Sequence, residues 1–369
     1  MSKARQLADN GAATPNRNMV INGAMNVAQR GTSSTGIGAS SGYFTCDRWL
    51  IACSGEGRLT ATQTADGPVG FANCLKLDCT TADTSIAAGE FLQVVQKIEG
   101  QNLQRIGKGV SGAKEITVSF YVKANAAFNF VCELNDLDNT RHISKLFATT
   151  TGWVKHELTF AADEDDGSSP FDDDNAASLN LTFWLHAGST WSGGTLNTAT
   201  FANTTNANRA AGVSSFFSST DNEFFITGVQ LEVGSSATPF EHKTFGQDLI
   251  ECQRYYTQET AASGSAYKRF GGGSWNTSTA GAVFIPLSTP MRDSSPTLVS
   301  KAAASYLVYS ANATDACTAL IINSESNNGT NSRIVALNFS TSSGGVAGEA
   351  LQLVGNNDTA SYLAIDAEL

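Results

Sequence analysis

Apolar and polar side chains alternate along several stretches of the chain. In residues 116–123, every second residue from Ile116 to Val122 is apolar, and the residues between them are mostly polar. This period of two is typical of an antiparallel strand with one buried and one wet face. The same pattern recurs in residues 128–134, 154–160, 179–185 and 225–233, where Gly228 indicates a bulge. Many short strands separated by turn residues predict a β-sandwich or jelly roll.

One segment has a different period. Phe245, Leu249, Cys252 and Tyr256 are spaced by four, three and four residues, which places them on one helical stripe. Thr244 can cap the start of such a helix. We therefore expect a short helix, bounded at residues 248–258, between two β domains.

The rest of the chain divides around this helix. Short apolar runs after residue 258 are interrupted by Pro286, Pro290 and Pro296, which indicates a smaller second β-sandwich. The first residues have some helical spacing, but the segment is too short for a stable isolated helix. The predicted fold is all-β, with two jelly-roll-like β-sandwich domains joined by a short helix. Its parts are an arm at 1–17, a jelly roll at 18–247, the helix at 248–258 and a second sandwich at 259–369.

Composition supports this fold class and narrows the partners. Charged residues make up 15% of the chain, below the usual ~25%, and Ser, Thr, Asn and Gly take their place, as sheets tolerate better than helices. The net charge of −11 argues against binding to a nucleic acid backbone, which needs clustered cations. No apolar run approaches the ~20 residues of a membrane span, and no signal-type apolar core occurs near Met1. We expect neither nucleic acid binding nor membrane insertion.

Cysteines and catalytic motifs give no sign of an enzyme. The seven cysteines are odd in number and form no CxxC pair, so we interpret them as small buried apolar residues rather than zinc ligands. The chain has no nucleophile elbow, no P-loop and no His-Glu-x-x-His segment. We predict no catalytic residues.

An acidic stretch is the most distinctive local charge feature. Asp163, Asp165, Asp172 and Asp174 lie in it, and carboxylate oxygens on a loop suit Ca²⁺. The alternative is a solvated loop without an ion. Paired glycosidase carboxyls need a rigid cleft, which such a loop does not provide.

A glycan-binding surface is indicated by aromatic and planar polar residues. If the apolar residues of 179–185 face the core, Trp184 and His186 face outward, where a ring could stack on a sugar. The alternative is that a strand, loop or subunit covers Trp184, because an exposed Trp is costly. The long loop at residues 188–219 is of a length that is usually functional or packed on a partner. The further candidates are Trp191, Asn208, Arg209 and, in a Gly-rich segment, Trp275.

Several short motifs occur in a fixed order over nearly the whole chain. They lie at residues 2–9, 17–25, 29–32, 45–49, 229–234, 237–241, 252–256, 290–292 and 366–369. In this ordered set the chain resembles a family of phage tail-fibre and appendage proteins, most familiar from marine phages. The resemblance implies a carbohydrate-binding-module-like jelly roll in a virion appendage, and a homotrimer.

These observations lead to one main functional expectation. It is a structural virion protein made in the bacterial cytoplasm, a tail-fibre or receptor-binding appendage subunit that contacts host-surface glycans. The arm would dock it to another virion protein through Ala4, Arg5, Leu7 and Ala8. The alternative is a head fibre or decoration protein without a receptor role. A depolymerase tailspike is disfavoured, because the chain shows no long parallel β-helix repeat and no pair of catalytic carboxylates.

Overall fold

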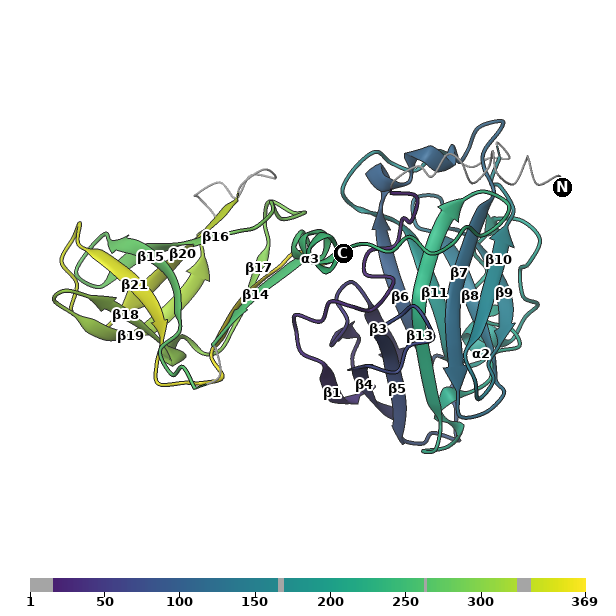
Figure 1. Cartoon of the computed structure of the whole chain (residues 1–369), viewed down its shortest axis with the longest axis horizontal. Helices are drawn as coiled ribbons and strands as arrows, with labels where there is room; N and C mark the ends of the chain where they lie inside the picture. Colours follow the sequence, from purple (N-terminus) through teal and green to yellow (C-terminus); the bar gives the residue numbers. More distant parts are fainter. Residues whose placement is uncertain (1–15, 165–168, 262–263, 324–332) are drawn as a thin grey trace. The chain divides into compact units, whose positions relative to one another are not determined.

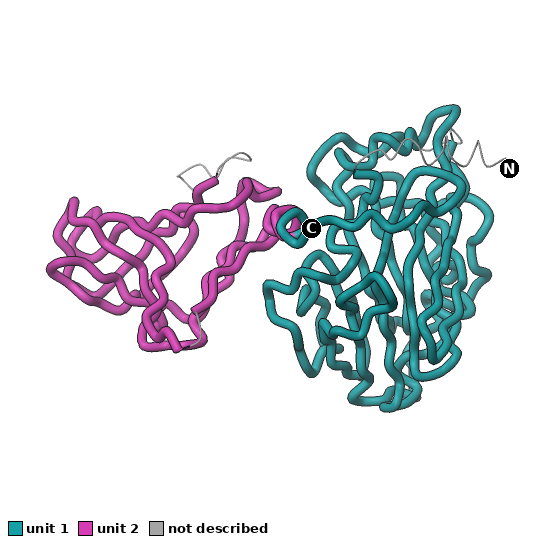
Figure 2. Tube along the Cα trace, viewed as in Figure 1, with its two compact units in different colours: residues 1–248 teal, residues 249–369 magenta. Residues whose placement is uncertain are grey.

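The computed structural model describes residues 16–164, 169–261, 264–323 and 333–369. The chain divides into two compact units, Met1–Asp248 and Leu249–Leu369 (Figure 2). No helix among the described residues is long and apolar enough to cross a membrane. The arm residues Ala4, Arg5, Leu7 and Ala8 and the loop residue Asp165 lie outside the described residues.

The first unit is a sandwich of two antiparallel sheets (Figure 1). The sheet that we name the β7 sheet consists, in spatial order, of β1 (Ser33–Ile37), β4 (Arg58–Thr64), β5 (Cys74–Thr81), β13 (Glu223–Val233), β7 (Ile116–Ala124) and β10 (Val154–Phe160). The β11 sheet consists of β12 (Ala202–Asn203), β9 (Arg141–Ala148), β8 (Asn129–Asp136), β11 (Ala177–Ala187), β6 (Phe91–Glu99), β3 (Leu50–Ser54) and β2 (Gly42–Tyr43). Short helical turns lie in the connections: η1 (Gly100–Asn102), η2 (Gln104–Ile106), α2 (Ser189–Ser192), η3 (Asn206–Asn208) and η4 (Phe216–Ser218).

The core lies between the two sheets, as the alternation predicts. Phe120 of β7 contacts Phe183 of β11 edge to face, with ring centroids 5.0 Å apart, and both side chains are fully buried. Phe130 of β8 and Phe224 of β13 make a second such contact across the core at 5.4 Å. Burial of these faces is the main stabilising contribution to the fold, and the all-β prediction is confirmed.

The predicted irregularity in β13 is also present. Its pairing with β7 shifts between Thr227 and Gln230, and Gly228 has a φ of 62°. This left-handed conformation favours glycine because a Cβ would clash with the backbone. The bulge keeps Val229 and Leu231 in the core and Gln230 on the outer face.

The second unit differs from the predicted sandwich. Six strands form a closed barrel, in the order β15 (Arg269–Trp275), β16 (Ala280–Pro286), β20 (Ile334–Thr341), β19 (Thr314–Ile322), β18 (Tyr306–Ser310) and β21 (Ala350–Gly355). β14 (Tyr256–Thr260), β22 (Tyr362–Asp366) and β17 (Thr297–Ser300) form a separate three-stranded sheet, and η5 (Ala303–Ser305) precedes β18. The barrel closes because β15 pairs with both β16 and β21, which removes the open edges that a sandwich would leave.

The predicted helix is present with different bounds. α3 spans Phe245–Gln253, whereas residues 248–258 were expected. Thr244 precedes the helix and caps its N-terminus, because its Oγ1 accepts a hydrogen bond from the Gln247 backbone N–H at 3.4 Å. The helix ends early because Tyr256 already starts β14, where it pairs with Asp366.

Candidate functional site

Trp184 lies on the outer face of the β11 sheet, as its position in the alternation predicts, but it is fully buried. It packs in a small cluster with Val131 and Ala210, because residues 188–219 fold back over this face. Its indole Nε1 donates a hydrogen bond to Glu133 Oε2 at 2.9 Å. The expectation of an exposed sugar-stacking ring at Trp184 is therefore wrong, and the alternative, a covering loop, is what the structure has.

Arg209 holds that loop in place. Its guanidinium donates two hydrogen bonds to the Glu133 carboxylate, from Nε at 2.7 Å and from Nη2 at 2.8 Å. The same guanidinium lies over the rings of Trp184 and Trp191, at 5.1 and 5.7 Å from their centroids. Asn208 Oδ1 accepts a hydrogen bond from the Thr195 backbone N–H at 3.0 Å. The structure thus brings four predicted site residues together, as an anchor for the loop.

The other two glycan candidates are also buried. His186 is 1% exposed and its Nδ1 is 2.8 Å from Ser215 Oγ. Trp275 is 1% exposed and packs edge to face on Phe339 in the barrel core, at 5.1 Å. The Gly-rich segment before Trp275 is strand β15 rather than a surface loop, so its ring faces inward, and exposure is wrong for both residues.

The acidic candidates differ in burial and in their partners. Asp163 is buried and pairs with Arg141 Nη2 at 3.0 Å and Lys108 Nζ at 3.6 Å. Asp172 and Asp174 are exposed, and Asp174 Oδ1 accepts the Ala176 backbone N–H at 2.9 Å. Among the described residues these three carboxylates form no converging group of metal ligands. The calcium site stays a prediction.

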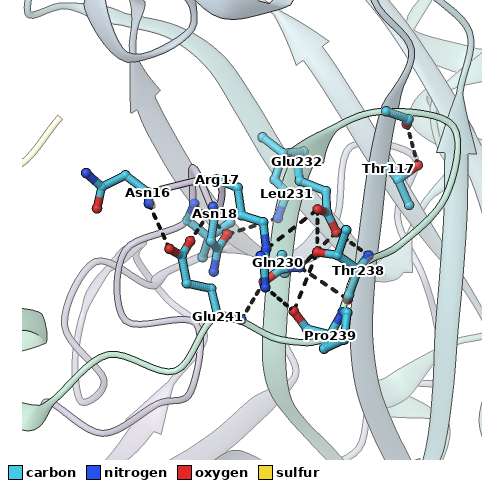
Figure 3. Close-up of polar contacts among 12 residues, drawn as sticks. Asn16, Arg17, Asn18, Thr117, Gln230, Leu231, Glu232, Thr238, Pro239 and Glu241 are labelled. Carbon is cyan, nitrogen blue, oxygen red and sulfur yellow. Dashed lines mark hydrogen bonds and ion pairs between the residues drawn. The ribbon is translucent and has the colours of Figure 1, made fainter. Parts of the chain in front are cut away.

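The polar residues of the motifs at 229–234 and 237–241 form a network on the outer face of β13 (Figure 3). Glu232 accepts hydrogen bonds from the backbone N–H and the hydroxyl of Thr238, at 2.8 and 2.7 Å. Gln230 Oε1 accepts the Glu241 backbone N–H at 2.8 Å. The Glu241 carboxylate in turn accepts the backbone N–H groups of Asn16 and Asn18, at 2.7 and 2.8 Å. These bonds fix residues 235–241 over the outer face of the β7 sheet.

That fixed segment forms one wall of an open pocket of about 470 Å³, which we name the Tyr121 pocket. The β4–β5 connection, at residues 69–71, forms the opposite wall. The floor comes from three strands of the β7 sheet and includes Ser119, Tyr121 and Lys155. Gly228 also lines it, and a Cβ there would lie 2.7 Å from Phe71 Cζ and 2.9 Å from Tyr121 Cδ2. The absence of a side chain at Gly228 therefore allows the Phe71 and Tyr121 rings to lie where they line the pocket.

Aromatic rings and one charged group define the chemistry of the Tyr121 pocket. Phe71 contacts Tyr121, Phe240 and His242, with ring centroids 5.3, 4.9 and 5.1 Å apart. Lys155 is exposed and its Nζ pairs with Glu157 Oε1 at 2.6 Å. Rings beside a charged group and hydroxyls suit a ligand with apolar faces and many hydroxyls.

The sequence analysis missed this pocket. Alternation places Tyr121 and Lys155 on the outer face of the sheet, and Phe240 lies within a motif. The sequence gives no signal that Phe71, about 50 residues before Tyr121, packs on the same face, because that contact depends on the strand order of the sheet.

A second, more polar pocket of about 320 Å³ lies between β9 and the covering loop. His142, Asn197, Asn203 and Asn208 line it. Asn197 Nδ2 donates to the His142 carbonyl at 2.7 Å and to the Thr200 carbonyl at 3.0 Å. Because the side chains of Asn197 and Asn208 are engaged within the loop and His142 is the one ring among the lining residues, this pocket suits a sugar less well than the Tyr121 pocket.

Comparisons with known proteins give only distant likenesses. No protein-family model matches the chain, and no curated protein matches it. A family 11 carbohydrate-binding module from Clostridium thermocellum is 11% identical over 56% of this chain and 98% of its own, with a TM-score of 0.27. The N-terminal cellulose-binding domain of a β-1,4-glucanase from Cellulomonas fimi is 12% identical over 47% of this chain and 86% of its own, with a TM-score of 0.25. A xylan-binding domain from Paenibacillus barcinonensis is 12% identical over 51% of this chain and 87% of its own, with a TM-score of 0.25.

Proposed function

We propose that the chain is a glycan-binding structural protein whose Tyr121 pocket holds the glycan. The observation that carries this proposal is the open, ring-walled pocket with Lys155 at its floor. Its volume lies within the ~300–1,000 Å³ typical of ligand pockets. The apolar face of a sugar would stack on Phe240 or Tyr121, and Lys155 and the hydroxyls would bind its oxygen atoms.

We further propose that binding occurs without catalysis. Hydrolysis of a glycosidic bond needs two carboxyl groups across the bond. The residues that line the Tyr121 pocket include no Asp or Glu. Incubation with host polysaccharide should therefore release no new reducing ends, and their accumulation would contradict a purely binding role.

We further propose that the protein forms homotrimers and is part of a virion appendage that faces the host. This proposal is supported by the ordered motifs of the sequence, and the arm at residues 1–17 is the proposed docking segment. A chain that lacks residues 1–15 should fold and oligomerise but should not assemble onto particles. Particles that incorporate the shortened chain normally would remove the docking role from the arm.

Two single substitutions test the glycan site. Phe240→Ala removes a stacking ring and Lys155→Ala removes the charged group, and each should weaken binding to a glycan that the wild-type chain selects from an array. We expect a loss of about tenfold or more per substitution, which corresponds to ~1.4 kcal/mol. The matched control is Tyr309→Ala, because Tyr309 is an aromatic residue of the second unit that is 53% exposed.

The results separate the alternatives. Unchanged glycan affinity in both pocket variants would show that the glycan binds elsewhere on the chain. If the wild-type chain binds no glycan from the host surface, the receptor-binding role is wrong. A head fibre or decoration protein is then the remaining alternative. Thermal unfolding of Lys155→Ala should match the wild type, since Lys155 is exposed. Phe240→Ala should unfold at a somewhat lower temperature, because Phe240 is half-buried against Phe71 and His242, so its glycan affinity is measured well below that transition.

A further inference from the structure

Three buried side chains converge at one end of the β11 sheet, away from the Tyr121 pocket. They are Asp83, Glu90 and His186, and one potential ligand atom from each lies within 4.8 Å of the others. Asp83 belongs to the β5–β6 connection, Glu90 precedes the first residue of β6, and His186 is next to last in β11. Their relative exposures are 7%, 8% and 1%.

Backbone contacts hold these three positions together. The Gly188 N–H donates to the Glu90 carbonyl at 2.8 Å, and the Thr190 N–H donates to the Ala88 carbonyl at 2.9 Å. A Cβ at Gly188 would lie 2.1 Å from the Ala87 carbonyl oxygen, so only glycine permits this approach. The Asp83 N–H donates to the Phe217 carbonyl at 2.8 Å. The fold therefore presets the arrangement of the two carboxylates and the imidazole.

The carboxylate oxygens are only partly satisfied by the protein. Asp83 Oδ1 accepts the Ser85 backbone N–H at 3.0 Å, and Glu90 Oε2 accepts the Ala87 backbone N–H at 2.9 Å. Asp83 Oδ2 is buried and accepts no hydrogen bond from an N–H or hydroxyl group in the described part of the chain, and the Asp83 and Glu90 carboxyl groups lie within interaction distance of each other. A buried carboxylate oxygen without a partner is costly, and a second carboxylate beside it adds repulsion. A cation between the two groups would remove both costs.

We propose that Asp83, Glu90 and His186 bind a divalent transition-metal ion of the zinc class. Zinc takes histidine nitrogen and carboxylate oxygen in small tetrahedral sites, and a water molecule would supply the fourth ligand. Calcium prefers six to eight oxygen ligands, so the imidazole disfavours it. Ser215 Oγ lies 2.8 Å from His186 Nδ1, which leaves Nε2 for the metal and orients the ring, as outer-shell partners of metal-bound histidines do.

The position of this site gives the ion a structural role. Two of its ligands lie in the β5–β6 connection and the third lies near the end of β11. Its outer-shell residue Ser215 lies in the loop at 188–219. Metal binding would tie the start and the end of that loop to the β11 sheet. Because an unfolded chain lacks the site, binding should stabilise the folded first unit.

Titration of the full chain with metal tests the proposal. After treatment with EDTA and dialysis, calorimetric titration with Zn²⁺ should give one bound ion per chain and raise the thermal midpoint by several degrees. Replacement by Co²⁺ should give visible absorption bands of a nitrogen- and oxygen-ligated ion. Asp83→Asn, Glu90→Gln and His186→Gln should each weaken Zn²⁺ binding by about tenfold or more, as the loss of a ligand requires.

A matched control separates this site from the acidic loop. The double variant Asp172→Asn with Asp174→Asn should bind Zn²⁺ as the wild type does. A metal-free wild-type chain that takes up no Zn²⁺, or a His186→Gln chain that binds it normally, would overturn the proposal. If His186→Gln fails to fold, the near-isosteric Glu90→Gln decides, and normal Zn²⁺ binding by that variant would equally overturn it.

Discussion

The Arg209 guanidinium and the Glu133 carboxylate form a two-bond ion pair across the outer face of the β11 sheet, at 2.7 and 2.8 Å. The Glu133 side chain is fully buried and that of Arg209 is 14% exposed. This two-bond arrangement fixes the relative orientation of the two groups in addition to their electrostatic attraction, because two parallel N–H groups face two oxygens. The pair connects a central strand of the sheet to the loop that covers it.

Removal of Arg209 should therefore be strongly destabilising. In Arg209→Ala, Glu133 remains buried without its cation, and we expect a loss of about 3–5 kcal/mol in the free energy of unfolding. Urea denaturation followed by tryptophan fluorescence measures it. The double variant Arg209→Met with Glu133→Leu removes both charges and should be more stable than the single variant. If the single variant is as stable as the wild type, the pair does not anchor the loop.

Trp184 should contribute to stability rather than to glycan binding. Trp184→Phe keeps much of the ring but loses the Nε1 donor to Glu133, so we expect about 1–3 kcal/mol of destabilisation. The folded variant should bind glycan as the wild type does. Trp153→Phe is the matched control, because Trp153 is only partly buried. A loss of glycan affinity in Trp184→Phe without loss of stability would contradict this role.

The strands show which part of the fold is readable from sequence. β10 spans Val154–Phe160, the range that the alternation predicts, and the bulge at Gly228 is in the expected strand. Both features depend on neighbouring residues, since side-chain period and backbone conformation are local properties. Trp184 was also assigned to the correct face of its strand. Its burial under a loop was one of two alternatives, and the sequence does not decide between them, because the covering loop approaches from later in the chain.

The barrel and the two candidate sites were not predictable for related reasons. β15 contains Gly271, Gly272 and Gly273, which give no alternation and indicate a loop. Barrel closure further requires that β15 pair with β21, about 80 residues later. His186 likewise lies about 100 residues after Asp83 and Glu90, so the three residues show no metal-ligand spacing in the sequence. Sequence patterns report faces and turns, whereas these sites depend on which strands become neighbours.

Gly228 should be required for both the β13 bulge and the Tyr121 pocket. Gly228→Ala places a Cβ in the left-handed region, which costs about 1–2 kcal/mol, and displaces Phe71 or Tyr121. We expect lower stability in urea denaturation and weaker glycan binding in calorimetric titration. Gly246→Ala is the control, because Gly246 lies in α3 with nothing within 4 Å of its added Cβ. That change should stabilise by up to ~1 kcal/mol. Equal stability of both variants would contradict the strain at Gly228.

His142 should make the first unit sensitive to mild acid. Burial lowers the pKa of His142, and the neighbouring Glu133 only partly opposes this effect. The unfolded imidazole, with a pKa of about 6.5, then binds protons at a pH where the folded one does not. The contribution of His142 to the free energy of unfolding should be constant well above the unfolded-state pKa of about 6.5. It should decrease as the pH falls through that value and towards the lower pKa of the folded state. Urea midpoints between about pH 5.5 and 8 measure this, above the range in which ordinary carboxylates titrate. His142→Gln should reduce the slope, whatever its effect on absolute stability.

The cysteines should be unreactive in the folded chain and should report the two units separately. All seven are buried and none forms a disulfide. Burial raises the pKa of the Cys317 thiol to about 12, and the pKa values of Cys74 and Cys79 to about 11. Because the thiolate is the reactive form, a disulfide reagent such as DTNB should label the native chain slowly and should label all seven thiols only in concentrated guanidinium chloride.

Cys252 and Cys317 lie in the second unit and the other five in the first. If the units unfold independently, labelling along a urea gradient should rise in two steps of two and five thiols. Rapid labelling of any thiol in native buffer would show that its burial is not maintained in solution.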